Sequence, residues 1–220
     1  MRMESLSVSN LKHDYTVYYS NEYENEIIDK ERLEVLKEVI DNQYMPRNAS
    51  KEINAFKFKT PTDIIFAFME PERKFIELLC EDVNVKTISA WIKSRNNGFY
   101  NIGYSIREGN HPKQKTFNPD FNIKIDESGW ENIVVVEIKA DNDDSKENKQ
   151  KYKYANQHFL LLNEKLARSG IKQKYLFHFV SPMSYNPFFE YLRDGRLIAG
   201  QFKSVLELML EQNGSSEEDN

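Results

Sequence analysis

Two acidic residues and one lysine have the types and the spacing that metal-assisted hydrolysis requires. Asp120 follows Pro119 at the start of a segment in which polar and apolar residues alternate. Glu137 and Lys139 stand two residues apart at the end of an apolar segment, so in a strand they share one face. Charged side chains at the end of a buried strand are costly unless something binds them. The pattern therefore indicates a polar site where two strands end.

The two segments that carry these residues, 117–125 and 133–140, are predicted to form a hairpin. If their connection is symmetric about Ser128-Gly129, Asp120 faces Glu137 with Cβ atoms about 5 Å apart. Carboxylates roughly 4 Å apart repel by about 4 kcal/mol at an effective dielectric constant near 20. A proton, an arginine or a hard divalent cation would each relieve this repulsion.

A magnesium ion suits such a site best. Oxygen ligands on a rigid hairpin, with no Cys or His nearby, favour Mg²⁺, with Mn²⁺ as a substitute. A divalent cation lowers the pKa of a bound water and neutralises charge on phosphate oxygens, and Lys139 is suited to orient that water. A surface salt bridge explains the same residues, and a register slip of one residue would separate Asp120 from Glu137. Both alternatives stay open at this point.

At these residues the chain resembles the PD-(D/E)xK nuclease superfamily, whose core hairpin carries an Asp and then Glu-x-Lys. More specifically, residues from about 60 to 189 resemble the C-terminal nuclease region of type III restriction enzyme Res-like helicases. The order and the spacing of several segments carry this resemblance, namely 89–94, 99–104, 117–121, 136–139 and 147–159.

The resemblance implies a metal-dependent endodeoxyribonuclease that leaves a 5′-phosphate and a 3′-hydroxyl. It implies an α/β fold with a restriction-endonuclease-like mixed central sheet flanked by helices. Asp120, Glu137 and the backbone carbonyl of Ile138 would bind the metal, and Lys139 would position the attacking water.

The family also implies polar residues on two helices. An acid on the first helix would complete the metal site; Glu72 fits it best, and Glu77 is the alternative. A helix after the Glu-x-Lys strand would present polar residues to the phosphate, of which Lys151 is the best candidate and Asn148 a second. A solvated helix face explains Lys151 nearly as well.

The stretch 91–115 mixes basic and aromatic residues, and Lys93 and Arg95 are its candidate nucleic-acid contacts. Basic side chains interleaved with aromatic rings can hold a phosphate backbone and stack on bases. Core aromatics with a charged solvated rim explain the same composition equally well.

Composition narrows the class of protein further. The chain has 220 residues, a formal net charge of −5 and one cysteine, Cys80, which excludes a disulfide framework and a cysteine-built zinc site. It has no apolar run long enough for a membrane span and no signal-peptide core at its start. We therefore expect a soluble, cytoplasmic protein with no membrane partner. Because the net charge is negative, binding of DNA would require a local basic patch or a bound metal ion.

The expected partners are DNA and an ATP-driven motor. Res-like proteins carry a helicase motor, but this sequence contains no Gly-x-x-x-x-Gly-Lys-Ser/Thr loop. We therefore expect either the nuclease domain of a larger helicase-nuclease or a freestanding relative. A homodimer is expected on the ground that a double-strand break needs two active sites. The alternative is a non-catalytic module with a nuclease fold that docks DNA or a motor subunit.

Periodicity and turn signals predict the elements that must position these residues. We expect an N-terminal lead-in over 1–59, a nuclease domain over 60–211 and a disordered acidic tail over 212–220. An extended Tyr-rich run at 15–23, turns at 42–54 and a helix start at 60–63 are also expected. Predicted helices are 29–40, 72–80, 146–166 and 202–211, and predicted strands are 87–93, 100–107, 117–125, 133–140 and 174–180.

Overall fold

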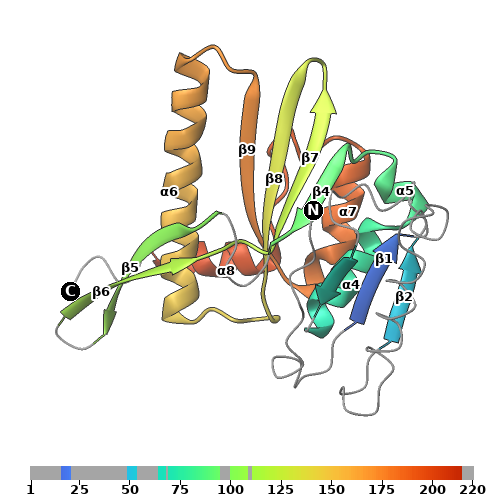
Figure 1. Ribbon diagram of the computed structural model, residues 1–220. Helices are drawn as coiled ribbons and strands as arrows, with labels where there is room; N and C mark the ends of the chain where they lie inside the picture. Colours follow the sequence, from blue (N-terminus) through green and yellow to red (C-terminus); the bar gives the residue numbers. More distant parts are fainter. Residues whose placement is uncertain are drawn as a thin grey trace. The chain divides into compact units, whose positions relative to one another are not determined.

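The computed structural model describes residues 16–20, 49–53, 64–67, 69–94, 100–108 and 111–214 (Figure 1). The chain divides into two compact units, Met1–Asp82 and Val83–Asn220, and each is described by itself. The predicted helix 29–40 lies outside the described residues, as do residues 215–220 of the predicted tail. The expected domain boundary near residue 60 stays a prediction.

A three-stranded sheet lies in the first unit. β1 (Thr16–Ser20) pairs in parallel with β2 (Ala49–Ile53) and antiparallel with β3 (Ile64–Ala67). β1 confirms the extended run over residues 16–20, and the rest of 15–23 lies outside the described residues. The prediction of turns is wrong for residues 49–53, which form β2, and the rest of 42–54 lies outside the described residues. The predicted helix start at 60–63 is wrong, because β3 follows it. Both strands gain their hydrogen bonds from β1, and such pairing overrides local turn and capping signals.

Helix α4 (Glu70–Leu79) confirms the predicted first helix of the nuclease region. Pro71 lies in its first turn, where the missing backbone donor costs nothing. The helix buries one apolar face through Phe75, Ile76 and Leu79. Glu70 and Glu77 are exposed, whereas Glu72 is half-buried and its Oε2 atom is buried.

The second unit is built on a mixed four-stranded sheet in the order β4-β7-β8-β9. β7 pairs antiparallel with both β4 and β8, and β8 pairs in parallel with β9. This arrangement confirms the predicted α/β class with a mixed central sheet flanked by helices. The strands are β4 (Ala90–Lys93), β7 (Phe121–Glu127), β8 (Trp130–Ile138) and β9 (Gln173–Val180).

The hairpin of β7 and β8 has the predicted register. Ser128 and Gly129 form its turn with φ angles of 51° and 78°, and positive φ at both positions is typical of tight hairpins. Phe121 pairs with Val136, so the two residues of each pair are equally far from the turn. Asp120, the residue before β7, therefore lies opposite Glu137 of β8.

Helix α6 (Lys146–Arg168) covers one face of this sheet (Figure 1). Ser145 caps it, because its side-chain oxygen accepts a hydrogen bond from the Asn148 amide at 3.4 Å. The helix buries an apolar stripe against aromatic residues of β9. The main members of this core are Val135, Tyr152, Ala155, Phe159, Phe177 and Phe179.

A second hairpin packs against α6. β5 (Ile102–Glu108) pairs antiparallel with β6 (His111–Phe117), and the pair projects away from the four-stranded sheet (Figure 1). Tyr104 and Ile106 of β5 are buried in the core that α6 shares with the sheet. The sequence predicted β5 but not β6, because β6 is mostly polar and exposed and contains Pro112.

The other helices of the second unit are short. α7 (Tyr185–Arg193) was not predicted, since Pro187 in its first turn obscures the helical pattern. α8 (Val205–Gly214) begins and ends three residues later than predicted. α5 (Asp82–Val85) and a 3₁₀ turn, η2 (Pro182–Ser184), complete the described elements. None of the helices in the described ranges has the length and apolarity that a bilayer crossing needs.

A buried carboxylate joins α8 to the sheet. Glu207 is 1% exposed, and its carboxylate accepts hydrogen bonds from the amides of Phe179 at 3.1 Å and Ser204 at 2.8 Å. It also lies 3.2 Å from Nδ1 of His178. The Glu207 amide in turn donates to Ser204 Oγ at 3.0 Å, which completes a reciprocal cap at the start of α8.

Replacing Glu207 with alanine should destabilise the protein by about 3–5 kcal/mol, because several buried donors would lose their acceptor. Urea denaturation measures this change in the free energy of unfolding. The control is Glu164→Ala, which removes an exposed ion pair with Arg168 and should cost about 0.5 kcal/mol or less. Equal losses in the two variants would contradict the assigned role of Glu207.

Candidate active site

Two hydrogen bonds fix Asp120 immediately before β7. Its backbone carbonyl accepts the Ser94 amide at 2.7 Å, which extends the pairing with β4. Its side-chain Oδ2 accepts the Ile138 amide at 2.7 Å. The carboxylate thus satisfies a backbone donor of β8 at the point where β7 supplies no further acceptor. Asp120 is therefore held across the hairpin from the end of β8.

Glu137 and Lys139 form a buried ion pair at that end of β8. The Lys139 Nζ lies 2.6 Å from Glu137 Oε1, and Glu137 is 5% exposed. Glu137 Oε2 is also buried, and it accepts no hydrogen bond in the part of the chain that the structure describes. A buried acceptor without a donor costs about 1–3 kcal/mol. Oε2 is thus the atom of this pair that can still take a ligand.

Burial and charge act in opposite directions on this pair. Burial raises the pKa of Glu137, although the positive charge of Lys139 opposes the rise. Burial of Lys139 disfavours its charged form, but the carboxylates of Glu137, Asp120 and Asp143 outweigh this effect and raise the Lys139 pKa. Lys139 therefore stays protonated at neutral pH and experiences the charge of both predicted metal ligands.

The donor set suits a hard divalent cation. Asp120 and Glu137 offer carboxylate oxygens, and the unpartnered Oε2 of Glu137 is an acceptor that a cation would satisfy. The described ranges contain no cluster of three or more His, Cys, Asp or Glu side chains able to hold a metal. Mg²⁺ is commonly held by one or two carboxylates, with waters and substrate phosphates as its other ligands. The residues present therefore fit a magnesium site of this open kind.

Lys151 lies beside this pair on α6. Its positive charge acts on Glu137, and its Nζ lies 3.1 Å from Glu147 Oε1 and 5.8 Å from the ring centre of Tyr104. The Tyr104 hydroxyl donates to Glu147 Oε1 at 2.7 Å. Hydrogen bonds from Tyr104 and Lys151 lower the pKa of Glu147 to about 2. Lys151 is thus held in place by an acid that the sequence analysis did not select.

Asn148 ties the start of α6 to the loop that follows β8. It is 4% exposed, and its Nδ2 donates to the Asp143 carbonyl at 3.1 Å. The charge of Asp143 in turn acts on Lys139. Asn148 therefore supports a loop next to the candidate site, and its contact with nucleic acid stays a prediction. Asp143 was not among the predicted site residues either.

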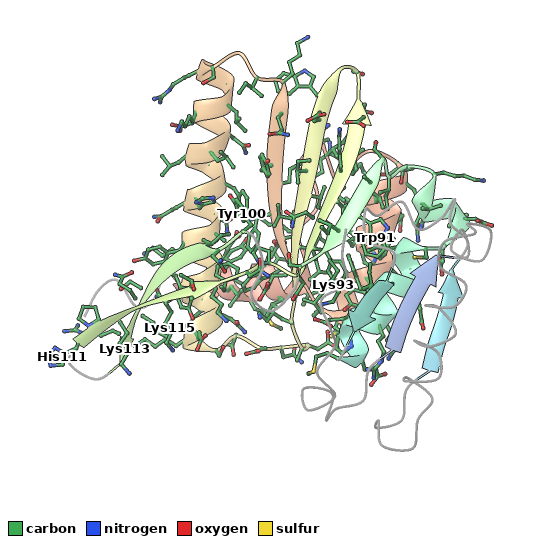
Figure 2. All side chains as sticks on the ribbon, viewed as in Figure 1. Trp91, Lys93, Tyr100, His111, Lys113 and Lys115 are labelled. Carbon is green, nitrogen blue, oxygen red and sulfur yellow. The ribbon has the colours of Figure 1, made fainter. Side chains whose placement is uncertain are left out.

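The other predicted residues are farther from this cluster or lie outside it. Lys93 is on β4, and its Nζ lies 5.8 Å from the ring centre of Phe121 (Figure 2). Arg95 lies outside the described residues. Glu72 belongs to α4 in the first compact unit, so its place in the metal site stays a prediction. The role of the Ile138 carbonyl as a ligand also stays a prediction.

Comparison of this chain with family models, with curated proteins and with solved structures finds no match.

A divalent cation should stabilise the protein through Asp120 and Glu137. At 100 times its dissociation constant, Mn²⁺ would add about 2.7 kcal/mol, or roughly 5–10 °C in melting temperature. Asp120→Asn and Glu137→Gln should each remove most of this rise. The control is Asp126→Asn, which changes an acid at the opposite end of β7. Equal stabilisation of all four proteins in a thermal melt would contradict a metal site at Asp120 and Glu137.

Proposed function

We propose that this protein is a metal-dependent endodeoxyribonuclease. One observation carries the proposal: Asp120 and the Glu137–Lys139 pair meet at one end of the β7–β8 hairpin, with Glu137 Oε2 buried and unpartnered. Two carboxylates and an amine on one rigid hairpin match the chemistry of phosphodiester hydrolysis. The resemblance to the PD-(D/E)xK nucleases assigns the same three residues.

Each residue then has a separate role. Asp120 and Glu137 would hold Mg²⁺, with the Ile138 carbonyl and Glu72 as further ligands by resemblance. When bound, the ion supplies Lewis acidity and lowers the pKa of a coordinated water. Lys139, protonated and held by Glu137, orients the attacking water and donates to a phosphate oxygen.

Lys151 would act on the substrate from α6. Its ammonium group lies against the Tyr104 ring and beside Glu147, and its charge reaches Glu137. A phosphate entering the site would therefore find a positioned cation on the helix side. Lys93 on β4 and Arg95 after it are proposed as contacts with the DNA backbone outside the reaction centre.

The proposal extends to the setting in which the protein works. We propose that it acts in the cytoplasm in a restriction-type system. An ATP-driven motor domain or subunit would bring it to its DNA, since the sequence has no phosphate-binding motor loop. A homodimer would supply the two active sites that a double-strand break needs.

Cleavage of plasmid and single-stranded DNA in Mn²⁺ or Mg²⁺ tests the proposal. Asp120→Ala and Lys139→Ala should each reduce the cleavage rate by at least about 100-fold, because each removes a group that acts on the reacting phosphate. Asp126→Ala and Lys124→Ala, farther along β7 toward the hairpin turn, are the matched controls and should cleave normally.

Cleavage that survives both site changes would refute the site assignment. If the wild type binds DNA in an anisotropy measurement but does not cleave it, even with its motor partner added, the protein is the non-catalytic docking module instead. Cleavage and binding measured together therefore separate the two functions.

A further inference from the structure

A groove of about 400 Å³ lies between the β5–β6 hairpin and the first half of α6. Its helix side consists of residues spaced four apart, which share one face of α6. Its hairpin side includes alternate residues of β5, on the face opposite to the buried Tyr104 and Ile106. The lining residues are Ser105, Arg107, Pro112, Lys146, Gln150 and Tyr154.

Two positive charges in this groove have no acidic neighbour in its lining. Arg107 and Lys146 are exposed, and neither forms an ion pair with another described residue. The acid beside the groove, Glu147, already contacts Lys151 at 3.1 Å and Lys115 at 3.6 Å. A groove with two such cations and no acid in its lining has the chemistry that an extended anion requires.

The dimensions of the groove suit a nucleic-acid strand. Positions 146, 150 and 154 span about 12 Å of helix, which is the rise of three to four nucleotides at about 3.4 Å each. Lys151, the residue after Gln150, is on the adjoining face of α6 and exerts its charge on Glu137, so the groove lies beside the helix face that borders the candidate active site. Figure 2 shows the side chains of Lys113 and Lys115 on β6, the other strand of the hairpin.

We propose that this groove binds the sugar–phosphate backbone of DNA, with Arg107 and Lys146 each contacting a phosphate. The inference rests on the proposed function and adds a second contact region to the same substrate. The hairpin and α6 hold one strand between them, and α6 guides it toward Glu137. Phosphate contacts fix the position of DNA without reading its sequence. Binding through the groove is therefore independent of sequence and strongly dependent on salt.

The test compares two double variants that remove the same charge. Arg107→Gln/Lys146→Gln changes the groove, and Lys165→Gln/Lys172→Gln changes exposed lysines at and just beyond the other end of α6. Fluorescence anisotropy in EDTA measures binding of a labelled duplex between 50 and 200 mM salt, conditions chosen to span a strong electrostatic effect. The groove variant should bind about 10- to 60-fold more weakly at 0.1 M salt. The slope of the logarithm of its binding constant against the logarithm of salt concentration should become shallower by about 1.8, because two phosphate contacts are lost.

Equal loss of affinity in both variants would overturn the groove, since it would reflect net charge alone. Tighter, groove-dependent binding of an RNA of the same sequence would also overturn the proposal, because the groove would then be an RNA-binding site. Equal melting temperatures of the two variants exclude misfolding as the cause of a difference. If the wild type cleaves DNA and the groove variant binds as the wild type does, only the groove inference fails. If binding depends on the groove but no DNA is cleaved in Mn²⁺, only the proposed function fails.

Discussion

The register between β7 and β8 is the constraint on which the candidate site depends. The left-handed Ser128 and Gly129 close the hairpin so that the residue before Phe121 comes opposite the residue after Val136. β7 begins only at Phe121, so the Asp120 side chain, and not a backbone carbonyl, accepts the Ile138 amide. This hydrogen bond holds the aspartate beside Glu137. A slip of one residue would turn every side chain of one strand to the other face and separate the two acids.

Two lysines lie near these two acids, but one carboxylate oxygen is left without a donor. Lys139 pairs with Glu137 through Oε1, and burial raises the Glu137 pKa while leaving Oε2 without a donor. Lys151 adds a second positive charge from α6, where Glu147 holds it. Under the proposed function, a divalent cation would satisfy the acceptor that remains, Oε2 of Glu137.

Those features that depend on local pattern were predictable from the sequence. Period-two alternation predicted β7, and the position of Ser128-Gly129 predicted its pairing with β8. Contacts between distant segments were not predictable: β3 owes its pairing to β1, and Glu147 meets Tyr104 across 43 positions of the chain. Of that network only the spacing of four residues between Glu147 and Lys151 was visible beforehand. The proposed function rests on the chemistry of these residues and on a family resemblance.

We propose that Asp120 and Glu137 share one divalent ion at the end of the hairpin. A crystal grown with Mn²⁺ can show this ion, because manganese is located by its anomalous scattering. We expect an anomalous peak in contact with Asp120 and with Oε2 of Glu137, with Lys139 beside it. A well-ordered hairpin with no anomalous peak at these carboxylates, at a Mn²⁺ concentration that supports binding elsewhere, would contradict it.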